Sequence, residues 1–378
     1  MKRIFSLGVI LLIICGLIWV SCQKKVEEKV VKIGAILPLT GDGAKYGKSA
    51  KNGIDLAIED INKKGGILGR QVKVIYEDSQ ADASKAVSAF RKIVNVEHIK
   101  FILGPLSSTE VLAVAPIANK EKVIILAPAA SAPQITYAGD YIFRNVMSDL
   151  YDGWAMAAYV IKGMKKKTAA IFYINNDFGI GLKNSFKEQF EKMGGKVLLE
   201  ISFERGEKDF RAQITKIKNV NPEVVFLVGQ AEMAEILKEI KEMGIKLLIV
   251  SFSMFEDPDI LKVAGDAAEG VVYTYRVFNP ESENPVVKHF VERYEKKYGV
   301  KPDIFAGLSY DAARILALAL ERGEFKVEKV KEALYNIKNF PGVVGKTSFD
   351  KNGDVKKPIG IKKVENGKFI WVTKVFEF

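Results

Sequence analysis

Short apolar runs alternate with longer amphipathic segments from residue 31 onward. The run at 31–37 ends before Pro38 and is typical of a buried strand, and the segment at 47–63 repeats apolar residues at helical spacing. The same two patterns continue, with strands expected at 72–76, 101–103 and 123–127 and helices expected at 82–96 and from 107 onward. This alternation predicts a parallel sheet with right-handed crossover connections.

The alternation starts again after residue 143 and predicts a second unit of the same kind. Its strands are expected at 168–174, 197–203, 224–228, 247–250 and 270–275, its helices at 182–193, 210–220 and 231–243, and a loop at 175–181. Three helices then follow with little strand between them, so we expect them to cover the sheet of the first unit; they lie at 286–298, 305–320 and 327–335. The Asn-Gly pair at 366–367 predicts a final hairpin, from strands at 359–364 and 369–376, that completes the second unit.

The two units predict an α/β protein of two Rossmann-like, doubly wound lobes joined by a three-segment hinge. A chain of 378 residues is too long for one ordinary core, which supports this division. We expect residues 31–148 with 276–348 to form the first lobe and residues 149–275 with 349–378 to form the second. Three crossings of the chain would then make a hinge, with a ligand cleft between facing strand ends.

Residues 1–22 have the pattern of an export signal. Two basic residues precede an apolar run of 17 residues, which is followed by Ser21 and Cys22. This pattern resembles a bacterial lipoprotein signal, in which Cys22 becomes the lipid-modified first residue of the mature protein. The alternative is an uncleaved N-terminal anchor; in both cases the bulk of the chain lies outside the cytoplasmic membrane, in the periplasm or at the cell surface. The polar residues 23–30 then form a short tether.

The composition offers few groups for catalysis. Both cysteines, Cys15 and Cys22, lie in the leader, and the two histidines, His98 and His289, lie far apart in the sequence. Disulfides, thiolate metal sites and histidine-based nucleophilic catalysis are therefore not expected. We predict a protein that is not an enzyme and needs no cofactor. The net charge of +11 is spread over amphipathic segments without interleaved aromatic residues, so no nucleic-acid partner is predicted.

The segment at 104–131 carries the candidate ligand site. A serine and a glutamate three residues apart form a capping-box pattern, which places Ser108 in the first turn of a helix, where free amides favour an anion. The next predicted strand brings Ala129 and Ser131 to the same carboxyl edge of the sheet, where ligands bind in open α/β proteins. We therefore expect a carboxylate or another oxygen-rich group here. The alternative is that these serines only cap the helix.

These segments resemble the type I periplasmic binding proteins, and more narrowly the leucine/isoleucine/valine-binding family that delivers solutes to ABC importers. The resemblance covers essentially the whole mature chain. It rests on long motifs in the same order, namely IGAILPLTGDGAKYGKSAKNGIDLAIEDINKKGGILGR at 33–70, GPLSS at 104–108, FRNVMSD at 143–149, GDAAEGV at 265–271 and SYDAA at 309–313. It implies a receptor whose lobes close over a small solute.

The family's ligand positions in the first lobe fall on four residues of this chain. The serine that holds the substrate carboxylate falls on Ser108. The alanine carbonyl and the hydroxyl residue after the next strand fall on Ala129 and Ser131, with serine in place of the usual threonine. The aromatic residue that walls the side-chain pocket falls on Tyr46. The resemblance therefore implies that these four residues bind the ligand.

The second lobe departs from the family. The tyrosine of a Tyr-Gly loop falls on Phe178, which keeps the ring and loses the hydroxyl, and a tyrosine after the third strand of that lobe falls on Gln230. The acidic residue that pairs with the ligand ammonium falls on Ser253. Because an unpaired buried ammonium costs about 2–5 kcal/mol, this loss bears on whether the ligand is an α-amino acid. Glu256 could reach the cleft from the same loop, although surface solvation is its expected role.

The sequence thus predicts an extracytoplasmic solute-binding receptor of an ABC importer. The expected ligand is a branched-chain amino acid or a related small carboxylate, and the expected partners are the permease and ATPase subunits and, through Cys22, the membrane. One alternative is a ligand without an amino group: an aromatic or aliphatic carboxylate, urea or a short amide. The other is a sensory protein built on the same scaffold.

Overall fold

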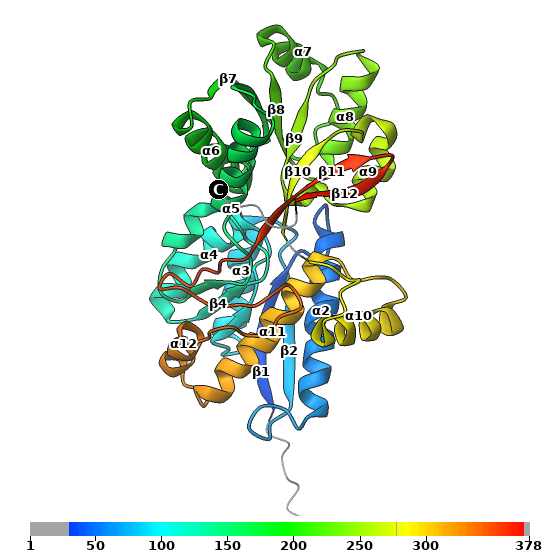
Figure 1. Ribbon diagram of the computed structural model, residues 1–378. Coiled ribbons are helices and arrows are strands. Elements are labelled where there is room, and N and C mark those ends of the chain that lie inside the picture. The colour runs from blue at the N-terminus through cyan, green and yellow to red at the C-terminus, as the bar shows by residue number, and fades with distance from the viewer. Residues whose placement is uncertain (1–29, 277, 374–378) are drawn as a thin grey trace, which may run out of the picture.

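The computed structural model describes residues 30–276 and 278–373, which form two α/β lobes, each built on its own sheet (Figure 1). This confirms the fold class predicted from the alternating pattern. Every helix in the described ranges is too short or too polar to span a bilayer. Cys22 and the export signal lie outside these ranges.

The sheet of the first lobe has five parallel strands in the order β2-β1-β3-β4-β5. They are β1 (Val31–Leu37), β2 (Val72–Asp78), β3 (Phe101–Leu103), β4 (Ile124–Ala127) and β5 (Ile142–Arg144). The central strands β3 and β4 are buried along their whole length because helices cover both faces of the sheet. Since the strands are parallel, their carboxyl ends lie together at the edge that faces the second lobe.

Two groups of helices cover this sheet. One face shares a hydrophobic cluster with α2 (Ala44–Lys63), α10 (Pro285–Tyr298), α11 (Ile304–Arg322) and α12 (Val327–Tyr335), and the other shares one with α3 (Ala83–Asn95) and α4 (Ser108–Glu121). The helices that follow the second lobe therefore return to the first, as predicted. Helix α2 packs closely on α11, because Gly53 has no side chain to keep the carbonyl of Ala306 away.

The second sheet has the order β12-β11-β10-β9-β8-β6-β7. Its strands are β6 (Thr168–Ile174), β7 (Lys196–Phe203), β8 (Val224–Val228), β9 (Ile249–Ser251), β10 (Val272–Arg276), β11 (Ile359–Glu365) and β12 (Lys368–Thr373), and the helices of this lobe are α5 (Asp149–Ala158), α6 (Asp177–Lys192), α7 (Arg211–Val220), α8 (Glu232–Glu242) and α9 (Pro258–Ala264). Strands β6 to β10 are parallel, and β11 and β12 add an antiparallel hairpin. Positive φ angles of 53° at Asn366 and 66° at Gly367 confirm the predicted turn.

The chain passes between the lobes after β5, after β10 and before β11. Figure 1 shows these three passages close together between the two sheets. Phe349 and Val355 pack in the hydrophobic cluster of the first lobe. We therefore place the third crossing after Val355, a few residues later than the sequence-based boundary at residue 348.

The loop predicted at 175–181 is mostly wrong, because α6 begins at Asp177. The side chain of Asn176 caps this helix and accepts a hydrogen bond from the amide of Gly179 at 2.9 Å. Two glycines in the first turns have low helix propensity, so the sequence pattern did not indicate that the helix begins there. They are needed for packing: a Cβ at Gly179 would lie 2.0 Å from the carbonyl oxygen of Ile174. The early start holds Phe178 in the first helical turn.

Candidate functional site

A cavity of about 240 Å³ lies between the lobes at the carboxyl ends of the strands. The first lobe lines it from the start of α2, the start of α4, the turn after β4 and the start of α11, and the second lobe lines it from the segments after β6, β7, β8 and β9. Six of the seven ligand residues predicted from the sequence line this cavity: Tyr46, Ser108, Ala129, Ser131, Phe178 and Gln230. The strand ends thus bring together residues that are far apart in the chain.

The start of α4 forms a hydrogen-bond donor end of the cavity. Glu110 accepts a hydrogen bond from the amide of Ser107 at 3.0 Å, which fixes the first turn of the helix. The Oγ of Ser108 accepts from the amide of Ala132 at 3.1 Å. Because this oxygen is already used as an acceptor, the hydroxyl hydrogen of Ser108 is available to donate into the cavity. Together with the free amides of the first helical turn, it is suited to bind an anion.

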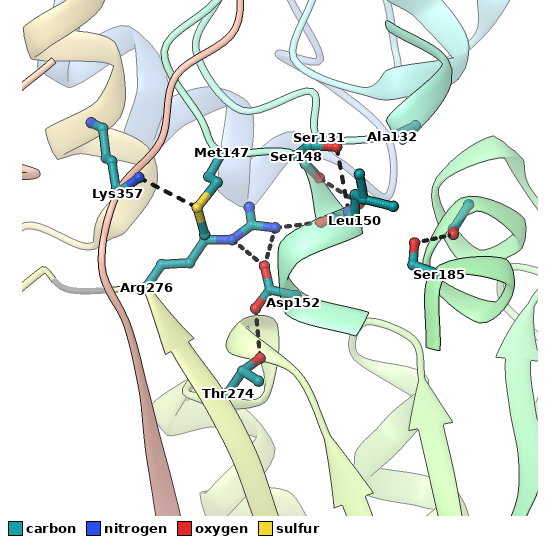
Figure 2. Close-up of polar contacts among 12 residues, drawn as sticks. Ser131, Ala132, Met147, Ser148, Leu150, Asp152, Ser185, Thr274, Arg276 and Lys357 are labelled. Carbon is teal, nitrogen blue, oxygen red and sulfur yellow. Dashed lines mark hydrogen bonds and ion pairs between the residues drawn. The ribbon is translucent and has the colours of Figure 1, made fainter. Parts of the chain in front are cut away.

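The turn after β4 forms an acceptor end. Ser131 donates its hydroxyl hydrogen to Oδ2 of Asp149 at 2.8 Å, so its oxygen is left to accept a hydrogen bond from a ligand. Asp149 is fully buried and ion-paired with Arg276, whose Nε also donates to Oδ2 of Asp152 at 2.6 Å. Figure 2 shows the guanidinium of Arg276 beside Asp152, with Ser131 close to the start of α5. A buried carboxylate therefore lies directly behind the acceptor hydroxyl.

Burial raises the pKa of Asp149 to about 6, with Arg276 opposing the rise and the nearby Asp152 adding to it. The network holds two carboxylates against one guanidinium, because Thr274 meets Asp152 with a neutral hydroxyl. Its net charge is thus negative when both acids are ionised. A cationic group of a ligand at Ser131 would compensate for this charge.

Arg144 holds the same turn from behind. Its side chain is fully buried and donates to the carbonyl oxygens of Ser131 at 3.0 Å and Ala132 at 2.8 Å. It also makes a two-point contact with Asp354, at 2.6 and 2.7 Å. Such a bidentate contact fixes both partners, so the acceptor end of the cavity has a rigid support.

Apolar and aromatic side chains form the rest of the wall. Tyr46 and Phe305 are 4.8 Å apart between ring centroids on the first lobe, and Phe178 packs 5.3 Å from Phe252 on the second. Burial raises the pKa of Tyr46 to about 12, with the charge of Asp257 adding to the rise, so its hydroxyl stays protonated. These walls suit an apolar side chain of a small ligand.

Two charged residues in the cavity were missed by the sequence reasoning. Glu204 and Arg205 follow β7 and line the cavity from the second lobe. Asn175, another lining residue, donates to Oε1 of Glu204 at 2.7 Å, and Arg205 lies 3.5 Å from the side-chain oxygen of Gln230. Their position after a strand of a parallel sheet was the available signal, but they sit in a run of charged residues that is typical of a solvated surface.

The family model for periplasmic binding proteins matches residues 30–368. The chain belongs to the periplasmic binding protein family. The leucine-, isoleucine-, valine-, threonine- and alanine-binding protein of Pseudomonas aeruginosa is 32% identical over 330 residues, which cover 86% of this chain and 87% of that protein.

Solved structures of this periplasmic binding protein family agree. The leucine-binding protein LivK of Thermotoga maritima superposes with a TM-score of 0.84 at 32% identity, over 90% of this chain and 97% of that one. The branched-chain amino acid transporter substrate-binding protein LivJ of Streptococcus pneumoniae, solved with isoleucine, gives 0.82 at 28% identity, over 90% and 98% of the two chains.

Two residues of the second lobe differ from expectation. Ser253 begins a short 3₁₀ helix (Ser253–Phe255) and is not among the described residues that line the cavity; Met254 takes that place. The surface role expected for Glu256 is wrong, because it is ion-paired with Lys362 and accepts a hydrogen bond from the hydroxyl of Tyr273 at 2.6 Å. With both its oxygens bound inside this periplasmic binding protein's second lobe, Glu256 does not replace the lost acidic residue.

The described part of the chain has no cluster of metal-binding side chains. Within residues 30–276 and 278–373, no three His, Cys, Asp or Glu side chains gather in a way that could hold a metal ion. The residues that line the cavity of this periplasmic binding protein offer hydrogen bonds, charge and apolar contact.

Proposed function

We propose that this protein is the extracytoplasmic solute-binding receptor of an ABC importer, and that it holds a branched-chain amino acid or a related small carboxylate between its lobes. The observation that carries the proposal is the opposite orientation of two serine hydroxyls in the cavity. Ser108 is oriented to donate and Ser131 to accept. A carboxylate needs donors and an ammonium needs acceptors, so the first lobe suits both ends of an α-amino acid.

Asp149 can take the role of the acidic residue that the family has at the position of Ser253. In this proposal its carboxylate supplies the negative charge for the ligand ammonium, acting through the hydroxyl of Ser131. The hydrogen bond to a carboxylate polarises that hydroxyl and strengthens it as an acceptor. The negative charge that the family supplies from the position of Ser253 is then supplied from the start of α5, and it acts through a hydroxyl of the first lobe.

We expect Asp149→Asn to weaken leucine binding about ten- to hundredfold, because a hydrogen bond to a charged group is worth about 1.5–3 kcal/mol. The affinity for isocaproate, which is leucine without its amino group, should fall much less in this variant. In the unaltered protein, affinity for leucine should also fall as the pH drops through about 6, because protonation of Asp149 removes its charge. Titration calorimetry of both ligands across this pH range measures these effects.

Asp152→Asn is the matched control for that variant. Asp152 lies one helical turn further along α5 and pairs with the same Arg276, but makes no hydrogen bond to Ser131. It removes one charge of the same network without a contact to Ser131, so it should reduce the preference for leucine over isocaproate by less than Asp149→Asn does. Equal losses of the two ligands in Asp149→Asn would contradict the proposed role of the carboxylate.

Closure of the lobes over the ligand is the second part of the proposal. We propose lobes of residues 31–148 with 276–355 and of residues 149–275 with 356–378. Lys45, on α2 of the first lobe, forms ion pairs with Asp257, at 2.9 Å, and with Asp259, both at the start of α9 in the second lobe. These contacts join the lobes beside the cavity, and the ligand stabilises the closed form by contacting both sides.

We expect Lys45→Ala to weaken ligand binding by no more than about fivefold, because an exposed ion pair contributes about 0–1 kcal/mol. The effect should disappear in high salt, which screens exposed charges. Ligand titration at low and high salt measures it. Lys48→Ala, an exposed residue on the same helix, is the control, and a loss that persists in high salt would show that Lys45 acts in another way.

Delivery requires partners that lie outside the described structure. We propose that the closed receptor docks on the permease of an ABC importer, whose ATPase drives transport, and that a lipid on Cys22 holds the protein at the membrane. The basic, apolar and cysteine-ending leader supports the anchor. Membrane fractionation tests it: Cys22→Ser should leave the membrane pellet, whereas an uncleaved anchor would keep it there.

A thermal unfolding panel tests the function itself. The ligands are leucine, isoleucine and valine, their deaminated acids, aromatic carboxylates, urea and short amides. A ligand present at 100 times its dissociation constant should add roughly 2.7 kcal/mol to the free energy of unfolding and raise the midpoint. A shift with amino acids supports the proposal, and a shift with deaminated acids or amides alone redirects it to those ligands. No shift with any of them would reject it.

A further inference from the structure

Arg205 is a cation in the cavity without a carboxylate partner of its own. It lies in the segment after β7, is partly buried, and lines the cavity from the second lobe. Among the described residues it takes part in no ion pair, and its hydrogen bond is to the side-chain oxygen of Gln230, at a long 3.5 Å. A guanidinium carries five donors in a planar fork, so one long hydrogen bond leaves most of these donors without a partner among the described residues.

The position of Arg205 relates it to the donor end of the cavity. Burial raises the pKa of Glu110, in the first turn of α4, and the positive charge of Arg205 acts against that rise. Arg205 on the second lobe and Ser108 at the start of α4 on the first lobe line the same cavity. Glu110 itself is engaged by the amide of Ser107 and stays further than ion-pair distance from Arg205. The group that both Arg205 and the α4 start can bind is an anion between them.

We propose that Arg205 binds the ligand's carboxylate from the second lobe, opposite Ser108 on the first. This inference rests on the proposed function and names the second-lobe contact that the family resemblance did not supply. A carboxylate held by Ser108, the α4 amides and Arg205 would connect the two lobes directly. The carboxylate, rather than the ammonium, is then the group that draws the lobes together.

This assignment has a consequence for specificity. The family resemblance put the second-lobe contact on the ammonium, at the position where this chain has Ser253. With the contact moved to the carboxylate, a ligand without an ammonium can still close the receptor. Acids such as isocaproate are then weaker ligands rather than excluded ones, while neutral amides of amino acids lose the closing contact.

The test compares leucine, isocaproate and leucinamide on the wild-type protein and on Arg205→Gln, by titration calorimetry. Leucine and isocaproate both carry a carboxylate, and leucinamide keeps the ammonium but has a neutral amide in its place. We expect Arg205→Gln to weaken leucine and isocaproate by about the same factor, ten- to hundredfold, and leucinamide by less than about threefold. Arg205→Lys, which keeps the charge and loses the fork, should recover part of the preference for leucine over leucinamide.

Arg211→Gln is the matched control. Arg211 is an exposed arginine of the same lobe, paired with Asp209 and outside the cavity lining, so its removal should leave all affinities within about twofold. Equal losses of leucine and leucinamide in Arg205→Gln, or no loss of either, would overturn the inference while leaving the proposed function intact. The unfolding midpoint of each variant separates a binding defect from a folding defect. Failure of the wild-type protein to bind any of the three ligands overturns the inference, and the broader ligand panel then decides on the proposed function.

Discussion

Arg144→Ala is expected to lower the free energy of unfolding by about 3–5 kcal/mol, the usual cost of removing one partner of a buried ion pair. The change leaves Asp354 without its two-point contact and the carbonyl oxygens of Ser131 and Ala132 without their donor. Because those carbonyls belong to the turn that forms the acceptor end of the cavity, ligand affinity should fall as well. Urea denaturation and ligand titration measure the two effects.

Arg144→Lys separates charge from geometry. Lysine keeps the positive charge but cannot reach the two oxygens of Asp354 and the two carbonyls at once, so it should recover only part of the stability. Arg211→Ala, at an exposed arginine, should change the free energy of unfolding by no more than about 0.5 kcal/mol. If Arg144→Ala stayed within 1 kcal/mol of the wild-type protein, the support assigned to this side chain would be wrong.

Gly47→Ala is the second large expected effect. A Cβ at this position of α2 would lie 1.9 Å from the carbonyl oxygen of Pro38, so the helix must move away from the strand end. Such overpacking costs about 1–3 kcal/mol, or more when backbone must shift. Pro38 and Tyr46 line the cavity on either side of the clash, so ligand affinity should fall together with the unfolding midpoint.

Gly53→Ala is the control for that variant because it creates a similar clash elsewhere. Its Cβ would lie 2.2 Å from the carbonyl oxygen of Ala306, in the packing of α2 on α11. It should lower the unfolding midpoint by a comparable amount while leaving ligand affinity closer to that of the wild-type protein. Equal loss of affinity in both variants would show that α2 transmits any displacement to the cavity.

The donor and acceptor residues of the first lobe were predictable because each follows from a local rule. Ser108 lies in the first turn of a helix with a capping-box pattern, and Ser131 follows a buried apolar strand that must end at the sheet edge. The capping-box pattern placed the helix start, and the hydrophobic pattern placed the strand. The orientation of the two hydroxyls could not be predicted from the sequence. It is set by hydrogen bonds with Ala132 and Asp149, whose positions depend on the tertiary fold.

The contacts of the second lobe were harder to predict, because they also join segments that are distant in the sequence. Glu256 is bound by Lys362, which is 106 residues away in the sequence, and no local pattern brings those two together. Arg205 lies in a segment with three other charged residues, Glu204, Glu207 and Lys208, and such a composition is typical of a solvated surface and does not indicate a ligand site. Its place in the cavity follows from the parallel pairing of β7 with β6, which brings the segment after β7 to the same sheet edge as the segments after β6, β8 and β9.

The described chain begins at the end of β1 that is farthest from the cavity (Figure 1). A fully extended segment from Cys22 to Val31 reaches at most about 30 Å, roughly the thickness of the hydrocarbon core of a bilayer. A lipid at Cys22 would therefore hold the base of the first lobe close to the membrane, with the second lobe at the far end of the molecule (Figure 1). The cavity between the lobes would then stand away from the bilayer, and bringing it to a permease in the same membrane would require the whole receptor to tilt on this short tether.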